Sequence, residues 1–156
     1  MKTTHLPTSY PLLCLLLALT LTALLSGCSD DDVNSLLPNV SLSVSGLNFK
    51  ANVDTFEIQT VTISNLTSEN VTIERVTSTN PEFFKLGGYY AENRLYELAT
   101  PFTIEGKGAR TLYIGFYPRE GITYSGKIIV ESLNRELKTE TDLVTVTGEG
   151  VVPTAE

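Results

Sequence analysis

The 156-residue chain contains no tryptophan and only one histidine, one methionine and two cysteines. The histidine, His5, and one cysteine, Cys14, lie in the first 27 residues, which we expect to be removed as an export signal. The rest of the chain then has no histidine for a Ser-His or Cys-His nucleophilic pair or for a histidine metal site. Its one remaining cysteine, Cys28, has no partner for an internal disulfide.

Positive charge is also scarce, with 11 Lys and Arg residues against 18 Asp and Glu residues and a formal net charge of −7. The chain has no basic cluster, which argues against nucleic acid or an anionic lipid as its main partner. Four carboxylates lie near the last predicted hairpin, but Arg135 and Lys138 interleave with them. We therefore expect a solvated charged surface formed by Glu131, Glu136, Glu140 and Asp142.

Phosphate-binding loops are not indicated either. Gly87-Gly88 and Gly106-Lys107-Gly108 are not followed by a helix whose N-terminus would bind a phosphate, so we expect both to form turns. The sequence therefore predicts no catalytic residue, no cofactor and no metal site, and a chain that is not an enzyme.

β-branched residues, in contrast, are abundant. Residues 28–156 contain 12 Val, 8 Ile and 16 Thr, so 36 of 129 positions suit a pleated sheet better than a helix. The length supports one domain with a real core and not two. These features predict an all-β domain.

An apolar run of 14 residues, Leu12 to Leu25, follows Lys2 and the free amine. A membrane-spanning helix needs roughly 20 apolar residues, whereas a shorter run is typical of the central part of a secretory signal. The run leads into Leu25-Ser26-Gly27-Cys28, which resembles the lipobox of bacterial lipoproteins. This resemblance implies cleavage before Cys28 and acylation of its thiol and new amine. An ordinary signal with a chance cysteine is the alternative.

Directly after the cysteine come Ser29, Asp30, Asp31 and Asp32. A serine and an acidic run at this place resemble the surface-export signal of Bacteroidota lipoproteins, which implies an outer-membrane protein that faces the cell exterior. A solvated acidic linker or a weak calcium patch is the alternative. Residues 29–38 span at most about 35 Å when extended, which keeps the domain close to the membrane.

We expect four segments: a signal peptide over 1–27, an acidic tether over 28–38, a β-sandwich over 39–152 and a tail over 153–156. Within the sandwich, short alternating runs are separated by turn residues, as in a sandwich or barrel. The side chains expected between the sheets are Val61, Ile63, Leu112, Ile114, Phe116, Ile128 and Val130.

Two details of the strands are also predicted. The run from Phe56 to Ser64 changes phase between Ile58 and Val61, which predicts a bulge near Gln59-Thr60 that brings Phe56, Ile58, Val61 and Ile63 onto one face. Tyr124, at the start of its strand, is expected to bond its hydroxyl to a neighbouring backbone as a corner tyrosine.

Several of these runs together resemble a known family. The first half contains Leu47-x-Phe49, then Gln59 to Asn65, then Ile73-x-x-Val76; the second half contains Leu112-x-Ile114-x-Phe116-x-Pro118, Tyr124-Ser125-Gly126-x-Ile128-x-Val130 and Val146 to Gly150. In this order they resemble the ASPM/SPD-2/Hydin-type immunoglobulin-like domains, which are grouped with PapD-like and choice-of-anchor modules. The resemblance implies a seven-stranded immunoglobulin-like sandwich of two antiparallel sheets, and a role in binding or scaffolding. The stretch from Gly87 to Thr100 is longer and more aromatic than the family's usual middle region.

That stretch contains the candidate ligand-binding residues. Exposed tyrosines supply flat apolar contacts, and nearby polar side chains supply directional hydrogen bonds. The candidates are Tyr89, Tyr90, Glu92, Asn93, Arg94 and Tyr96. They would stack on a sugar ring or dock a protein; the alternative is that the rings only cover the sheet edge.

The sequence thus predicts a non-catalytic binding or scaffolding lipoprotein, anchored in the membrane through its acyl chains, with a protein or glycan partner. Two alternatives stay open. The domain is then either a glycan-binding accessory of a polysaccharide-uptake system or an assembly partner that works by strand addition. Residues 40–49 and 140–148 are expected to form sheet edges, and whether these edges are open or blocked is expected to decide between strand addition and the other roles.

Overall fold

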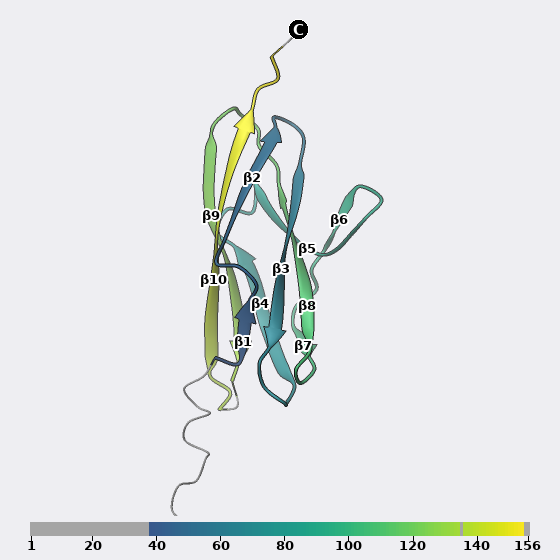
Figure 1. Cartoon of the computed structure of the whole chain (residues 1–156), viewed down its shortest axis with the longest axis vertical. Coiled ribbons are helices and arrows are strands. Elements are labelled where there is room, and N and C mark those ends of the chain that lie inside the picture. The colour runs from purple at the N-terminus through teal and green to yellow at the C-terminus, as the bar shows by residue number, and fades with distance from the viewer. Residues whose placement is uncertain (1–37, 135, 155–156) are drawn as a thin grey trace, which may run out of the picture. The chain divides into compact units, whose positions relative to one another are not determined.

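The computed structural model describes residues 38–134 and 136–154 (Figure 1). The predicted signal peptide, Cys28 and the acidic run that follows it lie outside the described residues. The described residues form ten strands and no helix. The strands are β1 (Val40–Leu42), β2 (Gly46–Asn52), β3 (Glu57–Asn65), β4 (Val71–Ser78), β5 (Phe84–Ala91), β6 (Arg94–Glu97), β7 (Phe102–Ile104), β8 (Ala109–Phe116), β9 (Thr123–Leu133) and β10 (Thr139–Val151).

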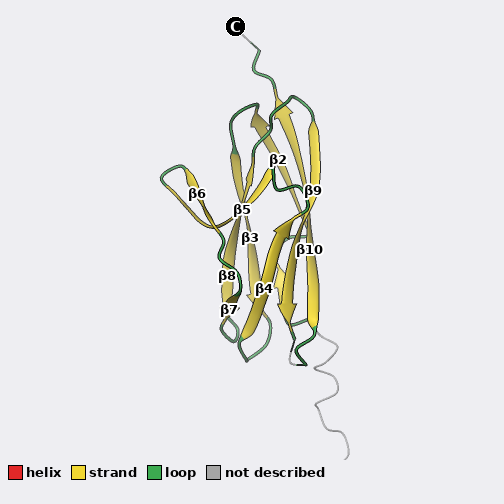
Figure 2. Ribbon diagram, turned by 180° about the vertical axis from the view of Figure 1, so that it is seen from behind, coloured by secondary structure: helices red, strands yellow, loops and turns green. Residues whose placement is uncertain are grey.

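The strands form two five-stranded sheets packed face to face (Figure 2). Their orders are β1-β3-β8-β5-β6 and β2-β10-β9-β4-β7. The predicted all-β immunoglobulin-like sandwich is confirmed. The strands number ten and not seven, partly because the chain crosses from one sheet to the other between β1 and β2. β2 then pairs with β10 in parallel, whereas the other pairs among the described strands are antiparallel.

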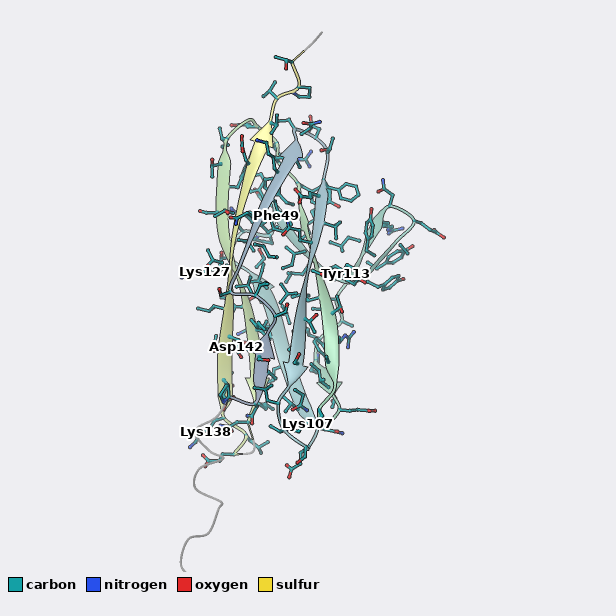
Figure 3. All side chains as sticks on the ribbon, viewed as in Figure 1. Phe49, Lys107, Tyr113, Lys127, Lys138 and Asp142 are labelled. Atoms are coloured by element: carbon teal, nitrogen blue, oxygen red, sulfur yellow. The ribbon has the colours of Figure 1, made fainter. Side chains whose placement is uncertain are left out.

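The core lies between the two sheets, and the seven side chains predicted for it are each at most 1% exposed. Three phenylalanines fill its centre, Phe49 from one sheet and Phe84 and Phe116 from the other. Their ring centroids lie 5.2 to 5.9 Å apart, within the range of favourable aromatic contacts. The labelled Phe49 can be followed in Figure 3.

The predicted bulge near Gln59-Thr60 is wrong. β3 pairs with β8 from Glu57 to Ser64 without a shift in register. Regular alternation therefore places Val61 and Ile63 in the core and Phe56 and Ile58 on the outer face of the sheet. The prediction failed because it assumed that every apolar residue of the strand faces inward.

The prediction of a turn at Gly87-Gly88 is also wrong. Both glycines lie within β5, and neither has a positive φ. A methyl group on Gly87 would lie 2.2 Å from Cδ1 of Leu95, so this glycine permits a close side-chain approach. The turn at Gly106-Lys107-Gly108 is confirmed, with Lys107 at φ 61°.

Tyr124 is a corner tyrosine, as predicted. Its hydroxyl accepts hydrogen bonds from the backbone N–H groups of Arg119 at 3.1 Å and Glu120 at 2.9 Å. These bonds fix the loop between β8 and β9 onto the start of β9.

Candidate functional site

The candidate residues lie on the hairpin formed by β5 and β6, which stands to one side of the sandwich in both views (Figure 1, Figure 2). Ala91 pairs with Arg94, so the turn consists of Glu92 and Asn93. Their φ angles are 50° and 58°. Two-residue turns with positive φ at both positions match the twist of a hairpin, and asparagine adopts this conformation readily.

Tyr89, Arg94 and Tyr96 share one face of the hairpin, which we call the tyrosine face. The Tyr89 and Tyr96 rings stack with centroids 4.2 Å apart and planes 9° apart. The Arg94 guanidinium carbon lies 5.2 Å from the Tyr96 ring centroid, a cation–π distance. Tyr89 is 52% exposed, so a flat aromatic surface is open to solvent beside a cation.

The opposite face of the hairpin packs against the sandwich. Tyr90 donates a hydrogen bond from its hydroxyl to Oδ1 of Asn93 at 2.6 Å, and its ring lies edge-on to Phe56 with centroids 6.1 Å apart. Leu95, which pairs with Tyr90, lies over Gly87 and Gly115. The six candidates are therefore divided: the structure brings Tyr89, Arg94 and Tyr96 together and turns Tyr90 towards the sheet.

Sequence reasoning missed an aromatic cluster at the base of the hairpin. Phe56 stacks on Tyr117 with centroids 5.2 Å apart, and the Lys85 ammonium lies 4.7 Å from the Tyr117 ring centroid. Burial raises the pKa of Tyr117, and Tyr90 raises it further. The regular alternation of β3 was the signal that would have placed Phe56 here.

The sheet edges bear on strand addition. The edge strands β1, β6 and β7 have only three or four residues each, whereas β2 has seven. Two side chains of β3 cover the free side of β2. Glu57 Oε2 accepts the Lys50 N–H at 2.6 Å, and Gln59 Nε2 donates to the Asn48 carbonyl at 2.6 Å. Short edges and capped backbone groups oppose the addition of a strand.

Residues 140–148, expected to form an edge, lie in β10, an inner strand between β2 and β9. Pairing with β2 begins only at Thr145, so the first part of β10 lacks that neighbour. There Glu140 and Asp142 are half-buried between exposed residues. Burial raises the pKa of Asp142, and the charge of Glu140 raises it further. Inward-facing charges at an unpaired edge also oppose strand addition.

The carboxylates near the last hairpin form separate contacts. Glu131 makes two hydrogen bonds to the Arg75 guanidinium, at 2.7 and 3.0 Å, and these hold the pKa of Glu131 below its usual range. Glu136 pairs with Lys138, and Glu140 accepts hydrogen bonds from Asn39. Arg135 lies outside the described residues. Across 38–134 and 136–154, no group of three or more His, Cys, Asp or Glu side chains is placed to hold a metal ion.

A shallow pocket of about 210 Å³ lies where the chain enters the sandwich. Its lining mixes polar and apolar side chains from three segments: Asn39, Thr67, Glu69, Asn70, Val71, Thr72, Leu133, Asn134 and Leu137. Within the part of the chain that the structure describes, no helix is long and apolar enough to span a membrane.

No protein-family model and no curated protein matches the sequence. Solved structures do match. PapD-like domain 7 of human CEP192 has 15% identity and a TM-score of 0.57, and the match covers 74% of this chain and 87% of that one. The Caenorhabditis elegans MSP family member WR4 has 12% identity and a TM-score of 0.50, covering 74% and 100%.

The VesB protease of Vibrio cholerae also matches, with 11% identity and a TM-score of 0.54. That match covers 77% of this chain but 34% of the protease, so it says nothing of proteolysis in this chain. At these identities the likenesses show the fold alone. The chain has the immunoglobulin-like fold of PapD-like and MSP domains.

Proposed function

We propose that this chain is a lipid-anchored, non-catalytic binding module that faces the medium from a bacterial outer membrane. Acylated Cys28 anchors it, residues 28–38 tether it, and the sandwich presents the β5–β6 hairpin to a partner. The lipobox-like sequence and the acidic run support the anchoring. The single observation that carries the binding role is Tyr89, half exposed and stacked on Tyr96 on the hairpin face that points away from the sandwich.

A protein partner suits the tyrosine face better than a glycan does. Tyr96 lies against Tyr89 and near the Arg94 guanidinium, which leaves less of its ring free for a sugar. Stacked tyrosines beside an arginine are the residue types that dominate protein interfaces. A glycan is the second candidate, because exposed Glu92 and Asn93 form the turn of the same hairpin and supply hydrogen-bonding groups there.

The anchoring is tested by replacing the cysteine that we expect to be acylated. Cys28→Ala is expected to abolish acylation and correct processing, because the thiol that accepts the lipid is gone. Mass spectrometry of the N-terminal peptide and cell fractionation measure this change. Cys14→Ala, which changes the cysteine in the predicted signal, is the control and is expected to leave the protein in the membrane fraction. A bare thiol on Cys28 together with release into the culture fluid would contradict the proposal.

The binding role is tested on the tyrosine face. Tyr89→Ser is expected to lower affinity for the partner by about tenfold or more, as is usual for an aromatic residue at the centre of an interface. Crosslinking on intact cells identifies the partner, and titration with that partner gives the change in affinity. Leu143→Ser, at an exposed leucine of the other sheet, is the matched control. Equal affinities of the two variants for the partner would exclude the tyrosine face as the binding site. If the protein is retained on a polysaccharide array and Tyr89→Ser abolishes that retention, the partner is a glycan.

A further inference from the structure

The end of the sandwich where the chain enters is built from three turns, and we call it the Asn39 end. The turns connect β3 to β4, β7 to β8 and β9 to β10. Backbone bonds join the first two turns to each other and to Asn39: the Leu66 N–H donates to the Asn39 carbonyl at 2.9 Å, and the Lys107 N–H donates to the Thr67 carbonyl at 2.8 Å. Figure 3 shows Lys107 and Lys138 at this same end.

Two leucines project from these turns. Leu66 is 43% exposed and Leu137 is 78% exposed. Leu137 has a φ of 58°, a left-handed conformation that leucine rarely adopts. The turn is held by Asn134, whose Oδ1 accepts the N–H groups of Glu136 and Lys138, both at 2.9 Å. The exposed leucine is therefore fixed in place by a bonded turn.

One of the two lysines near these leucines has a charged partner. Lys138 forms an ion pair with Glu136, and the Lys107 ammonium donates a hydrogen bond to the Leu66 carbonyl. Exposed apolar side chains flanked by lysines are typical of protein surfaces that insert into the boundary between lipid headgroups and acyl chains. On a lipid surface without net charge, attraction of the two leucines would be mainly apolar and not electrostatic.

We propose that the Asn39 end rests on the lipid surface, with Leu66 and Leu137 inserted into its interfacial region. This inference rests on the proposed acylation of Cys28. Residues 28–37 span at most about 35 Å, so they keep the leucines within reach of the bilayer. Two leucines are too few to hold a free domain on a membrane, but the anchor makes their insertion an intramolecular step at high effective concentration.

The orientation that follows serves the proposed binding role. β9 runs the length of the sandwich, so Ile122, directly before it, lies at the end opposite Asn134, directly after it. The tyrosine face lies on the β5–β6 hairpin at the side (Figure 1), which contact at the Asn39 end leaves open to the medium.

The test uses the acylated, full-length mature protein in vesicles of phosphatidylethanolamine and phosphatidylcholine. Since Cys28 is acylated, a cysteine introduced at Leu137→Cys or Ile122→Cys is the only free thiol and takes one NBD fluorophore. Ile122 is the matched control because it is 50% exposed in a turn at the opposite end. We expect a blue-shifted emission and at least a twofold quenching by nitroxide lipids for the label at 137, and neither effect for the label at 122.

Adding Leu66→Ser to the Leu137→Cys protein is expected to reduce the quenching, and 1 M salt is expected to leave it unchanged. Circular dichroism confirms that each variant folds. Loss of the protein from the vesicles would overturn the anchoring and the docking together. A vesicle-bound protein with equal emission and quenching at positions 137 and 122 would overturn the docking alone, and so would greater quenching at 122.

Discussion

Replacing Phe116 with alanine is expected to lower the free energy of unfolding by about 3–5 kcal/mol. The Phe116 ring is fully buried and lies 5.8 Å from Phe49, 5.2 Å from Phe84 and 5.6 Å from Tyr124, measured between centroids. It therefore joins the two sheets at the centre of the core. Truncation would remove its contacts with all three rings and leave a cavity between the sheets.

The backbone beneath the ring has little freedom to close that cavity. A methyl group on Gly148 would lie 2.4 Å from Cζ of Phe116, so the ring packs directly on β10. Since β10 is hydrogen-bonded to both β9 and β2, it cannot move inward without breaking these ladders. We therefore expect a loss near the upper part of the range.

Urea unfolding measures the change in the free energy of unfolding, and the m-value is expected to be the same for the variant and the unsubstituted protein. Thr111→Ala is the control, because Thr111 lies on the same strand with its side chain exposed, and its change is expected to stay within about 0.5 kcal/mol. A loss below about 1 kcal/mol for Phe116→Ala would mean that Phe116 does not hold the sheets together.

The sandwich could be predicted because burial on one face of a strand imposes a strict alternation. Leu112, Ile114 and Phe116 alternate in this way, and each is buried as expected. The same alternation, counted from Val61 and Ile63, would have placed Phe56 and Ile58 on the outer face, but it does not show what covers them there. Tyr117 and the β5–β6 hairpin cover them, and these residues lie far along the chain from β3.

The aromatic stretch was predicted as a candidate site, but its division into two faces was not. The division depends on the position of the turn. A turn at Glu92-Asn93 pairs Tyr89 with Tyr96, whereas the expected turn at Gly87-Gly88 would have placed Tyr89 and Tyr90 beyond it. The glycines look like turn residues in the sequence but serve close packing against Leu95, a role that only the tertiary structure reveals.

Asn65, the last residue of β3, connects two turns. Its side chain is 3% exposed and joins the turn after β3 to the turn after β7. Nδ2 donates to the carbonyls of Glu69 at 2.7 Å, Glu105 at 3.0 Å and Ile104 at 3.1 Å. Oδ1 accepts the N–H and hydroxyl of Thr67 at 2.8 and 2.9 Å. One amide thus satisfies both donors and acceptors of the surrounding backbone.

Asn65→Asp is expected to lower the free energy of unfolding by more than about 3 kcal/mol at pH 7, because at least two carbonyls lose their donor and a charge is buried beside them. Burial and the nearby carbonyl oxygens would raise the pKa of the new carboxyl above the value that it has in the unfolded chain. The loss in the free energy of unfolding is then largest at pH values above the pKa that the new carboxyl has in the folded state. It becomes smaller as the pH falls through that pKa, since the protonated acid can again donate a hydrogen bond.

Urea unfolding at pH 7 and pH 4 measures both effects, each relative to the unsubstituted protein at the same pH. Asn134→Asp is the matched control, because the bonds that fix Asn134 in its turn are accepted by its oxygen, which the carboxylate keeps. Its change is expected to stay within about 0.5 kcal/mol at pH 7. Equal losses for the two variants, or a loss at Asn65 that does not shrink at pH 4, would show that the donated hydrogen bonds of Asn65 do not stabilise the Asn39 end.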